Sequence, residues 1–326
     1  MPEHGCALFG FMQGVWSEMS NYLDILNYYT ARREYKLVSP IQLSNTSTET
    51  AMNDIHKICD AHIHVFPYRL MEAILHWFVK QGWTMPYRQP IEELLKYLEN
   101  IGVTSAFVLG YVHKRDMAVG INLWLKDLCT QYSWLHPFAA LHQEDQAMES
   151  ILGQALDEWN FPGVKIHTFV QKVAVNDERL WPMYRMLCAR RKGLILHASG
   201  MPIESPYTRV ENLREVLRSF PNLKVTIAHM GLPNDFSLAV KLAASYPNVY
   251  LDTAFIFGNP RFPVQEEWLK AIEAYPTKFI FGSDFPVMDY SPFNAIQALK
   301  ELSLTGDVKT LLLWDNAMRF LDTEIS

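Results

Sequence analysis

The run ICDAHIHVF at residues 58–66 is a short apolar segment that carries two histidines, His62 and His64, near its C-terminal end. Such runs are typical of strands buried on both faces of a parallel sheet. Three later runs end in the same way: GLILHAS with His197, KVTIAHM with His229 and FIFGSDF with Asp284. Parallel strands that deliver nitrogen and carboxylate ligands at their carboxyl ends predict a (β/α)₈ barrel with a metal site on that face.

Strands and helices are expected to alternate from residue 58 onward. The expected strands are residues 58–66, 104–110, 135–141, 163–168, 193–199, 224–230, 249–254 and 279–284. Helical patterns lie between them, such as residues 91–102, which end in Gly102, and residues 177–191, for which Asn176 is the expected N-cap. This alternation predicts the α/β class and a parallel sheet closed into a TIM barrel.

The chain length of 326 residues favours one barrel with an extension over two equal domains, because one barrel takes about 250 residues. Residues 1–51 end in the polar stretch SNTSTETA and are predicted to be an N-terminal extension or linker. Residues 52–326 are predicted to form the barrel domain. Whether the extension packs as a helix or lacks fixed structure is left open.

Composition and charge exclude several classes of partner. A formal net charge of −6 at pH 7 gives no electrostatic footprint for nucleic acid or an anionic membrane. The apolar runs stay well short of the roughly 18 residues that a membrane span requires. The four cysteines are scattered, which fits a reducing cytoplasm. We therefore expect a cytoplasmic protein that acts on a small-molecule substrate, with homo-oligomerisation left open.

The histidines and the aspartate at the strand ends predict a shared metal site. In a strand, residues i and i+2 point to the same side, so His62 and His64 can chelate one ion. An isolated HxH pair is a weak signal, but His197, His229 and Asp284 occupy the same relative place on other strands. Histidines with a carboxylate suit Zn²⁺ or another divalent metal. Asp284 and His229 are the candidate general bases beside the metal-activated water.

Six motifs in a fixed order carry a resemblance to a known family. They are DAHIH (60–64), GVKIH (163–167), LILHAS (194–199), IAHMG (227–231), FGSDFP (281–286) and DNAMRFL (315–321). In this order they resemble the amidohydrolase superfamily, and within it the amidohydrolase-related (amidohydrolase 2) branch. That branch includes aminocarboxymuconate-semialdehyde decarboxylase and related decarboxylases, hydratases and lactone hydrolases.

The resemblance implies a role for each strand-end residue. His62, His64 and His197 would be metal ligands, and Asp284 would be a further ligand or the base. His229 would act on the substrate in one-metal members and would hold the second ion in two-metal members. We favour one ion per chain, most simply Zn²⁺.

Lys165 bears on the number of ions. In two-metal members of the superfamily, a carboxylated lysine on the fourth strand bridges the ions, and Lys165 lies on the fourth expected strand. The alternatives are a structural ion pair near the barrel mouth or a substrate-pocket residue. With one ion favoured, Lys165 and His167 are predicted to line the substrate pocket.

The expected function is that of a metal-dependent hydrolase that uses metal-activated water on a small amide, lactone or carboxylate-bearing substrate. One alternative is a non-oxidative decarboxylase of the same superfamily, and another is a non-catalytic barrel that binds a ligand. The connection at residues 65–90 is either a wall of the substrate pocket or a helical insertion on the barrel rim. Asp252 is expected to have a structural hydrogen-bonding role.

Overall fold

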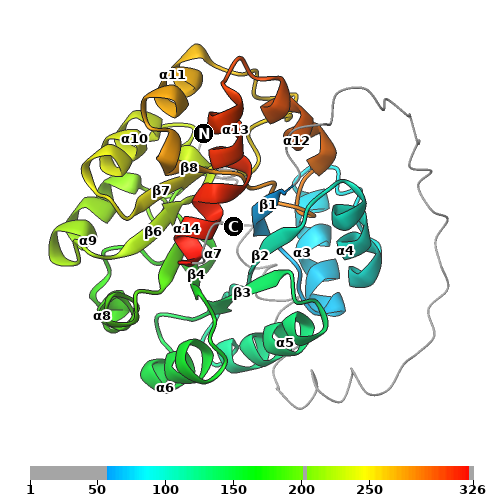
Figure 1. Ribbon diagram of the computed structural model, residues 1–326. Coiled ribbons are helices and arrows are strands. Elements are labelled where there is room, and N and C mark those ends of the chain that lie inside the picture. Colours follow the sequence, from blue (N-terminus) through cyan, green and yellow to red (C-terminus); the bar gives the residue numbers. More distant parts are fainter. Residues whose placement is uncertain (1–56, 201–203, 323–326) are drawn as a thin grey trace, which may run out of the picture. The chain divides into compact units, whose positions relative to one another are not determined.

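The computed structural model describes residues 57–200 and 204–322, and its centre is a barrel of parallel strands (Figure 1). The strands are β1 (Cys59–Ile63), β2 (Ser105–Leu109), β3 (Leu135–Ala140), β4 (Gly163–His167), β5 (Gly193–His197), β6 (Lys224–Ile227), β7 (Val249–Asp252) and β8 (Phe279–Ile280). They follow one another in sequence order around the sheet. The backbone N–H of Ala61 donates to the carbonyl of Phe281 at 2.9 Å, which joins β1 to the chain beyond β8.

Helices surround this sheet, as Figure 1 shows. They are α3 (Tyr68–Lys80), α4 (Ile91–Asn100), α5 (Ala118–Gln131), α6 (Met148–Gly153), α7 (Thr168–Gln171), α8 (Trp181–Arg190), α9 (Leu213–Ser219), α10 (Phe236–Ser245), α11 (Glu266–Ala274), α12 (Pro292–Glu301), α13 (Gly306–Thr310) and α14 (Asn316–Leu321). The strand residues are buried almost throughout because helices cover the outside of the sheet. This confirms the predicted (β/α)₈ barrel.

Two details differ from the sequence prediction. Several strands are shorter than expected, so that His229 and Asp284 lie in turns beyond β6 and β8. The predicted N-cap Asn176 is wrong, because Asp177 caps the short turn that leads into α8 by accepting a hydrogen bond from the Arg179 backbone N–H at 3.0 Å. A carboxylate there also interacts favourably with the positive end of the helix dipole. Asn176 instead donates a hydrogen bond to Glu215.

The C-terminal helix α14 covers the amino-terminal end of the barrel. Phe320 belongs to the same buried cluster as Phe107 of β2 and Phe138 of β3, with ring centroids 6.1 and 6.2 Å from theirs. Lys224, the first residue of β6, donates a hydrogen bond from Nζ to the carbonyl oxygen of Phe320 at 3.0 Å. The opposite, carboxyl-terminal end of the barrel is therefore the end left for a functional site.

The predicted extension, residues 1–51, lies outside the described residues. A shortened chain that begins at Met52 is expected to be soluble, to bind metal and to unfold in one cooperative transition, because the strand pattern starts only near residue 58. Circular dichroism during heating, together with metal analysis, checks this expectation. Insolubility of the shortened chain, with the full chain soluble, would contradict it.

In the described ranges, no helix combines the length and apolar character that crossing a membrane requires.

Candidate metal centre

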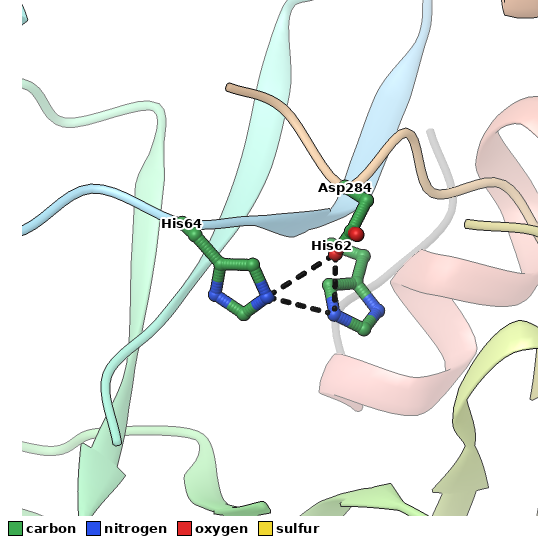
Figure 2. A group of neighbouring side chains, drawn as sticks. All are labelled: His62, His64 and Asp284. Carbon is green, nitrogen blue, oxygen red and sulfur yellow. Dashed lines mark hydrogen bonds and ion pairs between the residues drawn. The ribbon is translucent and has the colours of Figure 1, made fainter. Parts of the chain in front are cut away.

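Three side chains from two places in the chain converge at the carboxyl-terminal end of the barrel, as Figure 2 shows. His62 lies in β1, His64 follows β1 directly, and Asp284 comes from the loop after β8. The Nε2 atoms of the two histidines are 3.1 Å apart. Asp284 Oδ1 lies 3.4 Å from Nε2 of His62 and 3.2 Å from Nε2 of His64. One ligand atom from each residue lies within 4.8 Å of the others, so these residues could hold a metal ion.

The Nδ1 atom of each histidine, which points away from the group, already has a hydrogen-bond partner. His62 donates from Nδ1 to Asp252 Oδ2 at 2.9 Å, and His64 donates from Nδ1 to the carbonyl of Leu109 at 3.1 Å. With both protons committed there, each Nε2 turns a lone pair toward the other and toward the Asp284 carboxylate. This arrangement of second partners is the usual one behind metal-bound histidines. The donor set therefore fits a divalent cation.

Burial keeps these imidazoles neutral. Burial, followed by the charge of Lys165, holds the pKa of His62 well below its usual range. Burial also lowers the pKa of His64, although Asp284 opposes that change. For Asp284 itself burial raises the pKa, but the contact with His64 and the nearby His62 and His229 outweigh it, and the net pKa is below its usual value. Neutral histidines and an ionised carboxylate are the states that bind a metal.

Asp60 fixes the carboxylate relative to the histidines. Its Oδ1 accepts hydrogen bonds from the backbone N–H of Ser283 at 2.9 Å and of His62 at 3.2 Å. The Asp284 N–H donates to the carbonyl of His62 at 2.8 Å. Asp284 has φ of 77°, a conformation that few residues other than glycine adopt. Such strained positions persist when the surroundings hold them, and they cluster at functional sites.

Gly282 allows the loop after β8 to approach β1. A Cβ atom at this position would lie 2.7 Å from the Cβ of His62. Gly282→Ala is therefore expected to displace His62, to lower the metal content and to cost about 1–3 kcal/mol of stability through overpacking. Metal analysis and thermal unfolding measure both effects. The matched control is Gly306→Ala, where a Cβ would have no neighbour within 4 Å. Full metal content in Gly282→Ala would show that His62 has room to shift.

His229 lies close to this group without joining it. It sits in the turn after β6 with φ of 55°, and Asp252 Oδ1 accepts a hydrogen bond from its backbone N–H at 2.9 Å. Its Nδ1 donates to the carbonyl of Ala254 at 2.9 Å. Its Nε2 is 3.2 Å from Nδ1 of His197. One carboxylate, Asp252, thus orients both His62 and His229, in agreement with its expected hydrogen-bonding role.

His197 lies beside His229 and outside the compact group of three. His197 and His167 are the last residues of β5 and β4, they pair in register, and their rings stack at 3.9 Å. Because His229 gives its own proton to Ala254, its Nε2 accepts a hydrogen bond from Nδ1 of His197. That leaves a lone pair on Nε2 of His197. The assignment of His197 as a metal ligand remains a prediction.

Lys165 is fully buried, and its Nζ lies 3.2 Å from Nε2 of His62. Burial lowers the pKa of its amine to about 8, while Asp252 and Asp284 act in the opposite direction. The amine therefore reaches the metal group itself. This position is compatible with a role in the substrate pocket and with a bridge between two ions.

Aromatic rings line one side of the centre. Phe66 stacks on His64 with centroids 6.2 Å apart, and Tyr111 meets His64 edge-on at 5.3 Å and His167 at 4.9 Å. Phe66 belongs to the 65–90 connection, whose helix α3 follows it. Sequence reasoning missed Tyr111. Tyr111 comes two residues after the end of β2. Its position just beyond a strand end could have marked it as a residue of the site.

Comparison with known protein families also places this chain among the amidohydrolases. A family model, Amidohydro_2 (Amidohydrolase), matches residues 59–323. This chain belongs to that amidohydrolase family, and it is an enzyme of the metal-dependent amidohydrolase superfamily.

One relative in sequence and two solved structures are similar to this chain at low sequence identity. The uncharacterized protein y4mH of Sinorhizobium fredii (strain NBRC 101917 / NGR234) is 25% identical over 258 residues, which cover 71% of this chain and 84% of that protein. The crystal structure of 5-carboxyvanillate decarboxylase LigW from Sphingomonas paucimobilis has a TM-score of 0.64 and 14% identity, covering 82% of this chain and 100% of that one. A dihydroxybenzoic acid decarboxylase from Polaromonas sp. JS666, with bound manganese and the inhibitor 2-nitroresorcinol, has a TM-score of 0.61 and 17% identity, covering 82% and 97%.

Proposed function

We propose that this enzyme is a metal-dependent, non-oxidative decarboxylase of small hydroxylated aromatic acids. The observation that carries the proposal is the pairing of the His62, His64 and Asp284 group with the rings of Phe66 and Tyr111. The first can bind an ion, and the partly exposed ring of Tyr111, packed against the buried Phe66, offers an apolar surface to a planar substrate. The decarboxylases with the same fold act on substrates of this kind.

We assign one divalent ion to His62, His64 and Asp284, with Nε2 of His197 as a fourth donor. A bound divalent ion would supply positive charge that attracts and polarises the oxygens of the substrate. Three nitrogens and one oxygen suit Zn²⁺, whereas the manganese in the Polaromonas enzyme supports Mn²⁺ as the alternative. We assign Lys165 and His167 to the substrate pocket, where the buried amine of Lys165 adds attraction for a carboxylate.

Asp284 is the group that we expect to move the proton. Its side chain is 14% exposed, against 0% for His62 and 5% for His64, so it is the most accessible of the three. Its lowered pKa keeps it ionised, so it can accept the phenolic proton of the substrate. The carboxyl then gives this proton to the ring carbon as the carbon–carboxylate bond breaks and carbon dioxide leaves. His229 would orient the substrate beside it, with Nε2 released from its contact with His197.

Hydrolysis is the second candidate function, and the same carboxylate favours it. The ionised carboxylate can accept a proton from water, although its lowered pKa makes it a weaker base than a group whose pKa lies near neutral pH. The substrate would then be a small amide or lactone. Both candidates use the same residues, so only the products separate them.

Product analysis separates the two candidates. Protein loaded with Mn²⁺ or Zn²⁺ is incubated with 2,6-dihydroxybenzoate and 5-carboxyvanillate, and carbon dioxide release is measured. Benzoate, which lacks the hydroxyl group, is the matched control and should release none. A parallel panel of lactones and amides is assayed for hydrolysis. Turnover of that panel alone would replace decarboxylation with hydrolysis. No turnover of either panel by metal-loaded protein would show that the substrate belongs to neither class and would overturn the proposed decarboxylation of hydroxylated aromatic acids.

A further inference from the structure

A second cavity lies at the end of the barrel opposite the metal group. Its volume is about 450 Å³, and it opens among the amino-terminal ends of β3 to β6. Its lining includes Leu135 at the start of β3, Pro162 before β4, Lys192 before β5 and Lys224 at the start of β6. Because the strands are parallel, this cavity and the group formed by His62, His64 and Asp284 lie at opposite ends of the barrel.

Positive side chains dominate the lining of this cavity. They are Lys126, Arg190, Arg191, Lys192 and Lys224, and Asp322 is the only acidic residue among the lining residues. This concentration arises in a chain whose formal net charge is −6. The ARRK stretch at residues 189–192, which ends α8 and leads into β5, supplies three of the five.

Carboxylates neutralise only part of this charge. Arg190 pairs with Asp157 at 2.7 Å, and Lys224 pairs with Asp322 at 2.8 Å. Lys192 donates to the neutral amide oxygen of Asn160 at 2.7 Å, and Lys126 lies over the ring of Trp159, 5.4 Å from its centroid. Among the described residues, three of the five cations thus have no carboxylate partner in hydrogen-bonding contact.

Two of these cations, Lys192 and Lys224, are close enough to each other to repel. Burial lowers the pKa of the Lys192 amine, and Lys224 lowers it further, while Asp157 and Asp322 oppose the change. A cleft lined mostly by charges of one sign attracts counter-ions. Rings such as Trp159 and Phe320 give the cavity apolar walls beside the charges.

We propose that this cavity binds a small organic anion with about three negative charges, carried by phosphate or carboxylate groups, which would match the three unpaired cations. Arg191 and Lys192 contact the anionic groups directly. The cavity volume suits a ligand of metabolite size rather than a single inorganic ion. The proposal does not depend on the reaction at the metal centre.

Calorimetric titration of the metal-loaded, full-length protein tests the proposal. Fructose 1,6-bisphosphate is the phosphate probe and citrate is the carboxylate probe, each at low ionic strength. We expect saturable binding of at least one probe and weaker binding as salt is added. The two probes decide which anionic group is preferred. Saturable binding of neither would overturn the proposal.

A charge variant locates the binding. Arg191→Gln combined with Lys192→Gln is expected to weaken binding at least tenfold, because it removes two of the three unpaired charges. Arg185→Gln is the control, since Arg185 is exposed on α8, the helix before Arg191 and Lys192, and does not line the cavity. Either probe could also bind the ion in the metal centre, but such binding would be equal in both variants. Equal affinity in the double variant and the control would therefore overturn the proposal, and thermal unfolding verifies that both variants are folded.

Discussion

Replacing His64 with alanine is expected to remove the bound divalent ion and the enzymatic activity together. His64 contributes one of three ligand atoms that lie within 4.8 Å of one another. Loss of even a supporting partner of a metal ligand typically costs about 10–100-fold in metal affinity, so loss of a ligand should cost at least that much. The same result is expected for His62→Ala. Elemental analysis after purification without chelators, paired with turnover, measures both quantities.

Folding should survive this substitution. His64 lies just beyond β1 at the carboxyl-terminal end of the barrel, whereas stability in such barrels resides mainly at the other end. His76→Ala is the matched control, because His76 is exposed on α3 and away from the ligand group. The control should keep its metal and its turnover. Full metal content and full activity in His64→Ala would show that the ligand assignment is wrong.

The sequence was sufficient to predict the fold because the barrel repeats one simple signal. Each strand is a short apolar run, and the chemistry-bearing residues stand at or just after the strand ends. His62 and His64 could be placed on one side of β1 from the two-residue period alone. Asp284 could be assigned to the same face because it follows the eighth apolar run. Their convergence follows from the parallel order of the strands.

Other features of the site depend on contacts that no local pattern encodes. Asp60 ties the turn at Ser283 to β1 across 223 positions of the chain. Asp252 holds His62 from 190 positions away. The left-handed turn at His229 has no glycine at that residue to mark it. The bond to Asp252 sets the tautomer of His62, and therefore decides which of its nitrogen atoms remains available to a metal.

The number of bound ions also could not be predicted from the sequence, because it depends on where the amine of Lys165 lies. Its place on the fourth strand was predictable, but its distance of 3.2 Å from Nε2 of His62 was not. At this distance the amine competes with an ion for the same lone pair, or it becomes a ligand after carboxylation. Two ions per chain in the elemental analysis would select the second possibility over the single ion that we propose.

Replacing His229 with asparagine is expected to lower turnover by about 10²-fold, the loss that a misplaced substrate can cause, while the metal stays bound. His229 does not belong to the group formed by His62, His64 and Asp284. Asparagine suits the site because it tolerates the left-handed backbone conformation found there better than most residues do. The backbone N–H that donates to Asp252 is unchanged by the substitution. Turnover and metal content are measured on the same preparation.

Chemical rescue distinguishes a direct role of the imidazole from a structural one. His229→Ala leaves space where the ring stood, and added imidazole should restore part of the turnover if the ring acts on the substrate. A ring that is itself a metal ligand would give a variant whose metal content falls with its activity. That outcome would make His229 part of the metal site and favour two ions. Unchanged turnover in His229→Asn would instead make it a buried histidine that serves only the packing of the turn after β6.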